Sequence, residues 1–163
     1  MAGTKRVSGF VEIPDAPIMF KNFAGRERPP YNPEGYRNFC VVIEDTKLAD
    51  KLADDGWNVK TRQPRDGEGD PIVYLPVKIG YNVRPPHVIM VSAEGRETEL
   101  GEKDLEILDE VDIRCADIAI NPYNWEMRGN HGVTAYLKFG KFYLERTPFA
   151  DKYVQDELPF DES

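Results

Sequence analysis

The chain of 163 residues lacks long apolar runs and has little cysteine or histidine. It contains no apolar run of about 18 residues and no charged-then-apolar leader, so we expect neither a membrane-spanning helix nor a secretory signal. Cys40 and Cys115 are the two cysteines, and each lies in an apolar stretch. This placement predicts buried free thiols, not a disulfide framework, and a cytoplasmic protein.

Few side chains offer catalytic chemistry. His87 and His131 lie 44 positions apart without a second His or Cys at ligand spacing, so we expect no zinc site. The sequence has neither a phosphate-binding Gly-Lys-Ser/Thr loop nor a nucleophile elbow. One acidic segment, residues 94–112, holds nine carboxylates and two cations. Its carboxylates leave a Mg²⁺-dependent nuclease open as an alternative, but we favour a solvated surface and predict no catalytic residue, metal or cofactor.

The negative charge is unevenly distributed. The formal net charge is −8, but residues 94–112 and the last eight residues supply nearly all the excess acid. The remaining body is slightly basic, with clusters of cations at residues 21–37 and 60–65. Charges more than about 8 Å apart are strongly screened at physiological salt. A polyanionic partner is therefore compatible with this acidic chain.

Alternating apolar and polar residues predict a mainly β protein of six to eight short strands. Residues 45–55 form the clearest helix, with Asp45 as its cap, and residues 100–110 predict a second, short one. Pro76 lacks a backbone donor, which predicts an edge position or a bulge for its strand. A change of phase at Gly140 predicts a bulge that bends the last strand. A small, strongly bent barrel fits this pattern best, and a two-sheet sandwich is second.

Aromatic and basic residues recur together at exposed positions. A segment rich in Gly, Arg, Pro and Tyr, residues 25–35, reads as a long exposed loop, and Arg and Tyr residues are interleaved on through residue 38. Residues 121–128 read as a loop before the last strand. Single-stranded nucleic acid needs aromatic faces for its unpaired bases and cations for its phosphates. We predict phosphate contacts from Lys21, Arg26, Arg28, Arg37, Lys60, Arg62, Lys78 and Lys138, and stacking from Tyr31, Tyr36, Tyr74, Tyr123, Trp125 and Tyr136.

Two further readings stay open at this point. Trp57 shares strand parity with Val59, which favours a core position, whereas Trp125 fits either packing beneath a loop or base stacking. The same exposed aromatics also suit a non-catalytic protein-interaction or virion-structural barrel. Double-stranded DNA is disfavoured because the one clear helix is acidic, unlike a recognition helix.

Six blocks of sequence resemble the phage-encoded, OB-fold family of single-stranded DNA-binding proteins. They lie at residues 20–23, 37–43, 55–60, 74–78, 121–126 and 132–137. The resemblance covers residues 7–155 and implies a five-stranded barrel, with extra strands or hairpins, that binds single strands without sequence preference in phage DNA replication or recombination.

The last residues resemble a different family. Asp156, Glu157, Leu158, Pro159 and Phe160 are similar to the acidic, Pro-Phe-ending tail of bacterial single-stranded DNA-binding proteins, although three more residues follow Phe160. This resemblance implies that the tail binds replication or recombination proteins. We therefore expect a DNA-binding domain over residues 1–150, a flexible acidic tail over residues 151–163, the host cytoplasm as its location, and a chain capable of forming homo-oligomers.

Overall fold

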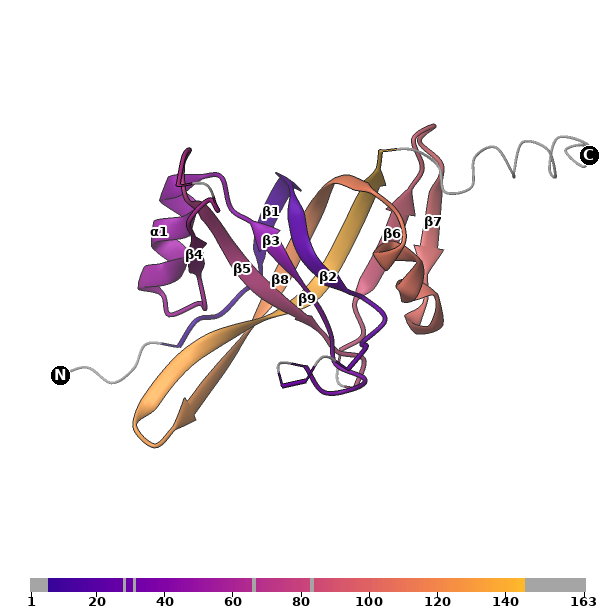
Figure 1. The fold of residues 1–163 in the computed structure, drawn as a ribbon. Coiled ribbons are helices and arrows are strands. Elements are labelled where there is room, and N and C mark those ends of the chain that lie inside the picture. The colour runs from indigo at the N-terminus through magenta and orange to yellow at the C-terminus, as the bar shows by residue number, and fades with distance from the viewer. Residues whose placement is uncertain (1–5, 28, 31, 66, 83, 146–163) are drawn as a thin grey trace, which may run out of the picture.

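A computed structural model describes residues 6–27, 29–30, 32–65, 67–82 and 84–145. Over these residues the chain forms one nine-stranded sheet with two short helices (Figure 1). The strands are β1 (Val11–Ala16), β2 (Ile18–Asn22), β3 (Arg37–Val42), β4 (Lys60–Arg62), β5 (Ile72–Ile79), β6 (His87–Val91), β7 (Glu97–Leu100), β8 (Ile113–Met127) and β9 (Asn130–Leu144). The helices are α1 (Thr46–Asp54) and the 3₁₀ helix η1 (Glu102–Asp109).

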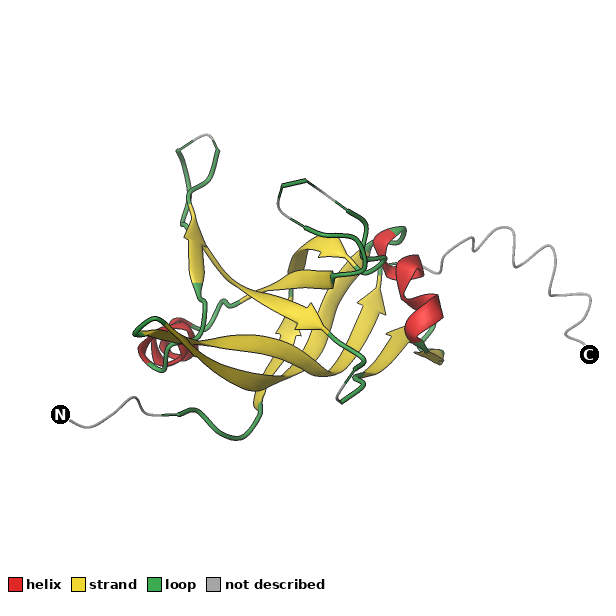
Figure 2. Ribbon diagram, turned by 90° about the horizontal axis from the view of Figure 1, so that it is seen from below, coloured by secondary structure: helices red, strands yellow, loops and turns green. Residues whose placement is uncertain are grey.

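The sheet is curved and OB-like, which confirms the predicted mainly β fold. Its main path is β1–β8–β9–β5–β3–β2, with β4 added to β5, and with β6 and then β7 added to β9. Strands β1 and β2 end this path, and no pairing between them is found within the described residues, so the sheet is not closed. The two helices lie at opposite ends of the sheet (Figure 2).

Three phenylalanine rings form the centre of the core. Phe23, Phe39 and Phe142 are fully buried, and their ring centroids lie 5.2 to 5.7 Å apart. Gly140 makes room for this cluster, because a Cβ at this position would lie 2.6 Å from the Phe142 ring. The cluster joins the chain after β2 to the middle of β3 and the end of β9, and so holds the curved sheet around one core.

The bulge in β9 lies two residues before the predicted position at Gly140. Ala119 of β8 pairs with Phe139 and Ile120 pairs with Leu137, so Lys138 is the extra residue. Buried positions shift from odd to even numbers at this point. The bulge lets the first half of β9 pair with β5 and the second half pair with β6.

Strand β5 is internal and pairs with β3 without a register shift, so both alternatives predicted from Pro76, an edge position or a bulge, are wrong. Ile43 donates its N–H to the Val73 carbonyl, which fixes the antiparallel register of β3 and β5. In this register, even-numbered residues of β5 turn their backbone nitrogens away from β3. Pro76 then falls between the part of β5 paired with β4 and the part paired with β9, where no ladder bond is lost.

Helix α1 begins as the sequence predicts. The Asp45 side chain accepts hydrogen bonds from the N–H groups of Lys47 and Leu48, at 3.0 and 3.2 Å. Gly56, with a φ of +98°, ends the helix and leads into Trp57, which is 4% exposed and confirms the predicted core position. The Gly56 carbonyl accepts from the N–H of Val133, so the helix end is tied to β9.

The distal parts of β8 and β9 form a two-stranded arm, residues 121–136, which extends from the sheet (Figure 1). Tyr123 and Trp125 therefore lie in a strand, and the loop predicted for residues 121–128 is wrong. Pro122 and the two asparagines of this stretch suggest a loop, but a regular ladder from Asn121–Tyr136 to Met127–Asn130 overrides that local preference.

Candidate nucleic-acid interface

One surface of the sheet carries alternating rings and cations. In β5 the alternating burial pattern turns Tyr74 and Lys78 away from the core, and Lys60 of β4 is paired with Tyr74. The same surface continues through β9 onto the arm, because Lys78 is paired with Tyr136 and Tyr136 with Asn121. We call this surface the aromatic–basic face, and its members are Phe20, Lys60, Arg62, Tyr74, Lys78, Tyr123, Trp125 and Tyr136.

Contacts between the rings run along the face. Phe20 meets Tyr74 edge to face, with centroids 5.7 Å apart, and the guanidinium carbon of Arg62 lies 5.4 Å from the Phe20 centroid. On the other side of β5, the centroids of Tyr136 and Tyr123 are 6.0 Å apart. Such contacts fix the rings while leaving part of each accessible: Phe20 is 49% exposed and Tyr123 is 58% exposed.

The cations of this face are not neutralised locally. Within the described part of the chain, no carboxylate forms an ion pair with Lys60, Arg62 or Lys78. Strand positions of the same parity in β3, β4 and β5 carry no Asp or Glu. The face can therefore hold a polyanion without first breaking internal ion pairs.

A thiol lies beneath these cations. Cys40, in β3 opposite Pro76, is buried as predicted, and burial raises its pKa to about 11 although Lys60 acts in the opposite direction. Cys115, also buried, has a raised pKa because of burial and its hydrogen bond to Asp15. Neither thiol has the lowered pKa of a reactive cysteine, so we assign both to packing.

The segment between β2 and β3 is held beside the face by asparagine side chains. Asn32 donates to the carbonyls of Arg26 and Tyr36, each at 3.0 Å, and accepts from Asn38 at 2.8 Å. Asn38 is paired with Lys78 in the sheet, so this network starts at the edge of the aromatic–basic face. The segment and the β4–β5 turn rise on the same side of the sheet (Figure 2).

The predicted site residues divide into four groups. Seven of them lie on the aromatic–basic face: Lys60, Arg62, Tyr74, Lys78, Tyr123, Trp125 and Tyr136. Arg26 and Tyr36 are exposed in the neighbouring segment, and Lys138 lies at the β9 bulge, with its ammonium 5.1 Å from the Phe10 ring centroid. Arg28, Tyr31 and the tail residues 156–160 lie outside the described residues.

Two predicted cations are engaged elsewhere. The ammonium of Lys21 is 2.6 Å from the carbonyl oxygen of Val111, and burial lowers its pKa, partly offset by Asp109 and Asp112. Arg37 forms an ion pair of 2.9 Å with Glu102. Both therefore point toward the acidic segment.

Two exposed rings were missed from the sequence. Phe10 and Phe20 are 50% and 49% exposed, and each lies beneath a cation. Phe20 has a φ of +54°, and the β2–β3 register shifts between Met19 and Asn22. This irregularity turns the ring to the surface, and strand alternation alone gives no signal for it.

Several carboxylates of residues 94–112 have structural partners. Asp109 accepts from the N–H groups of Phe23 and Ala24, at 2.8 and 2.9 Å. Glu97 pairs with Lys141, and Glu99 lies 3.2 Å from His87. No group of three or more metal-ligating side chains occurs within the described ranges. This acidic end lies across the molecule from β4 and the arm (Figure 1).

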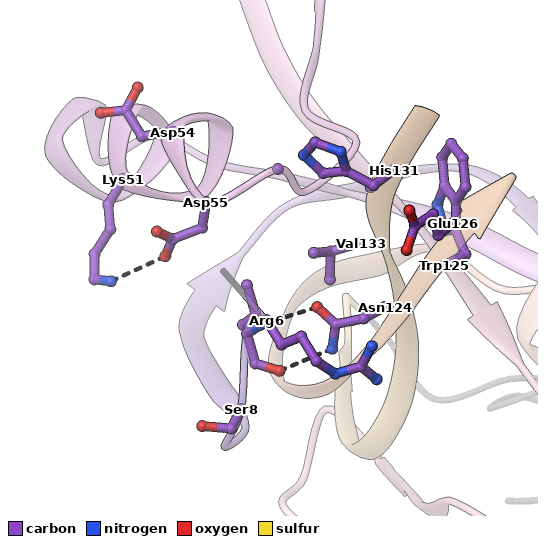
Figure 3. Close-up of a pocket in the computed structure, with 13 residues that line it drawn as sticks. Arg6, Ser8, Lys51, Asp54, Asp55, Asn124, Trp125, Glu126, His131 and Val133 are labelled. Carbon is purple, nitrogen blue, oxygen red and sulfur yellow. Dashed lines mark hydrogen bonds and ion pairs between the residues drawn. The ribbon is translucent and has the colours of Figure 1, made fainter. Parts of the chain in front are cut away.

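Two hollows flank the arm. The larger, of about 690 Å³, lies between the N-terminal segment, the end of α1 and the arm, and carboxylates of Asp54, Asp55 and Glu126 line it (Figure 3). The smaller, of about 430 Å³, is lined by Trp125, Pro76 and Lys78 and opens on the aromatic–basic face. Among the described residues that line the smaller hollow there is no Asp or Glu, so it suits a polyanion better than the larger one does.

An OB-like sheet with a ring-and-cation face is the architecture of a protein that binds single-stranded nucleic acid. The sequence matches the phage ssDNA-binding domain family over residues 2–162. The chain therefore belongs to this family of phage single-stranded DNA-binding proteins, which are not enzymes. This confirms the predicted family and the prediction that the chain is a binding protein.

Solved structures agree with the fold. The single-stranded DNA-binding protein of bacteriophage Enc34, in a C-terminal truncation, is 12% identical, with a TM-score of 0.55 over 89% of this chain and 95% of that chain. The Enc34 protein in complex with ssDNA is 14% identical, with a TM-score of 0.56 over 89% of this chain and 96% of the other. No curated protein sequence matches the chain. Within the described residues, no helix is long and apolar enough to cross a membrane.

Proposed function

We propose that the aromatic–basic face is the DNA-binding surface and that it binds single strands without sequence preference. The observation that carries this proposal is the combination of partly exposed rings with cations that have no carboxylate partner among the described residues. Any base can stack on a ring, and every phosphate carries the same charge, so this combination does not depend on base identity.

The order of the side chains on the aromatic–basic face defines a path for the bound DNA strand. It starts on the arm at Tyr123 and Trp125, crosses Tyr136 and Lys78, and reaches Tyr74 and Phe20 with their flanking cations. Arg26 and Tyr36, in the segment between β2 and β3, and Lys138 at the bulge extend this path at its margins. Arg28 and Tyr31, which lie outside the described residues, are proposed as further contacts. The Enc34 protein, which shares the fold, has been solved in complex with ssDNA, and this supports the proposal.

The biological setting follows from the family. A sequence-tolerant coat on unpaired strands suits phage DNA replication or recombination, in the cytoplasm of the host. The acidic tail, residues 151–163, is proposed to bind proteins of these processes, because its sequence places a short apolar stretch, Leu158, Pro159 and Phe160, between carboxylates. Formation of homo-oligomers is part of the same proposal.

Titration with oligothymidylate at two salt concentrations tests this function. We expect quenching of Trp125 fluorescence on binding, and an affinity that falls steeply as salt rises because cations released from the DNA contribute to binding. A virion-structural or protein-interaction barrel gives no quenching. Labelled strands incubated with Mg²⁺ should stay uncut, whereas cleavage would support the nuclease alternative.

A further inference from the structure

The smaller hollow has the size and lining of a subsite for one nucleotide base. Its volume of about 430 Å³ falls within the range of about 300–1,000 Å³ that is typical of small-ligand sites. Trp125 of the arm supplies an aromatic wall, Pro76 of β5 an apolar one, and Lys78 a cation. Asn58, in the connection between α1 and β4, also lines the hollow and adds a side-chain amide.

The larger hollow does not offer this combination. It is lined by Asp54 and Glu126, and its Lys51 is paired with Asp55 at 3.1 Å (Figure 3). A phosphate placed there meets carboxylates, and Arg6 is a cation of this lining that forms no ion pair with another described residue. The charge of the lining therefore favours the smaller hollow although its volume is lower.

The indole of Trp125 rests on a glycine. Gly132 is its cross-strand partner in the arm, and a Cβ added to Gly132 would lie 2.8 Å from Cζ2 of the indole, 3.0 Å from Cε2 and 3.1 Å from Nε1. These distances are shorter than ordinary van der Waals contacts, so the indole takes this position only because residue 132 has no side chain. An aromatic ring over a cross-strand glycine is a known way to pin a ring to a sheet.

We propose that the smaller hollow holds one unpaired base stacked on Trp125, and that Gly132 is the positioning residue for the indole. The inference rests on the proposed function and adds a specific subsite to it. Gly132 does not adopt a left-handed φ, so alanine fits its backbone conformation. Its effect is on the ring: a methyl group at residue 132 displaces the indole from the wall of the hollow.

A double-mutant cycle on oligothymidylate affinity tests this. We expect Gly132→Ala to weaken binding by about 10-fold, comparable to Trp125→Ala, because one stacked base contributes about that factor. In the Trp125→Ala background, Gly132→Ala should have no further effect, since the ring on which it acts is gone. Trp125→Phe should restore part of the affinity of Gly132→Ala, because the smaller ring leaves room for the methyl group.

Gly80→Ala is the matched control. A Cβ at Gly80 would meet the Tyr136 ring at 3.5 Å, which is an ordinary contact, so affinity should change by less than about twofold. The inference fails if Gly132→Ala binds as the unmodified chain does, if its effect is equal in both Trp125 backgrounds, or if Trp125→Phe gives no rescue. Absence of binding by the unmodified chain contradicts the proposed function instead, so the two failures are distinguishable.

Discussion

The aromatic–basic face and the acidic end carry charges of opposite sign and differ in how those charges are paired. At the acidic end, residues 94–112, carboxylates accept from backbone N–H groups or pair with cations, as Asp109, Glu97 and Glu102 show. On the face, Arg62 lies over a ring and, within the described residues, has no carboxylate partner. The named carboxylates of the acidic end are bonded within the fold, whereas the cations of the face form no ion pair among the described residues.

This contrast explains how a chain with a net charge of −8 belongs to a DNA-binding family. The acidic segment lies across the molecule from β4 and the arm (Figure 1), and at physiological salt the field of each charge is screened over about 8 Å. Net charge is therefore a poor guide to the ligand here, and the local pairing state of each charge is a better one.

The largest expected effect comes from removing the free cations. Changing Lys60, Arg62 and Lys78 together to Gln should weaken oligothymidylate binding by about 100-fold near 0.1 M salt and reduce the slope of log affinity against log salt by about 2. Each lost phosphate contact accounts for roughly 0.7 of that slope. Fluorescence anisotropy across a salt series measures both quantities.

A second triple variant controls for the change in net charge. Lys47, Lys51 and Lys103 are exposed cations on or beside the helices and lie off the face. Their replacement by Gln changes the net charge equally but should leave the salt slope almost unchanged. Equal slopes for the two triple variants would show that the charge of the whole chain, not the face, governs binding.

The next effect is on stability and concerns the acidic end. Asp109→Ala leaves the N–H groups of Phe23 and Ala24 without their acceptor, at a cost of about 2–4 kcal/mol in the free energy of unfolding. Urea denaturation measures this loss, and Glu110→Ala serves as the neighbouring control. DNA affinity of the folded protein should stay constant; a large loss of affinity without a loss of stability would contradict the assigned structural role.

The sequence predicted those features of the structure that depend on residues close together in the chain. The Asp45 cap, the buried Trp57 and the outward Tyr74 and Lys78 follow from capping chemistry and strand parity, and the structure confirms them. The OB-like fold also followed, because blocks along most of the chain resembled one family.

Features that depend on distant partners could not be predicted. Lys21 contacts Val111, which is 90 residues away, so no pattern in the sequence around Lys21 predicts this hydrogen bond. The arm around Trp125 is a strand only because its partner strand supplies a ladder, and Phe20 is exposed only because of a positive φ. Sequence patterns identify the residue types of the face, whereas tertiary pairing decides which of them stay free.

Substitution of Arg37 has the smallest expected effect and tests most sharply whether tertiary pairing decides which cations bind DNA. The sequence predicts a phosphate contact, but the structure pairs Arg37 with Glu102 at 2.9 Å. Binding DNA through Arg37 would first break this pair, so we expect Arg37→Gln to leave the salt slope unchanged and to cost under about 1 kcal/mol of stability, as is usual for a partly exposed ion pair. The same anisotropy series, with Glu102→Gln as its partner variant, measures this. A slope lower by roughly 0.7 in Arg37→Gln would instead return Arg37 to the DNA path and extend the interface toward the acidic end.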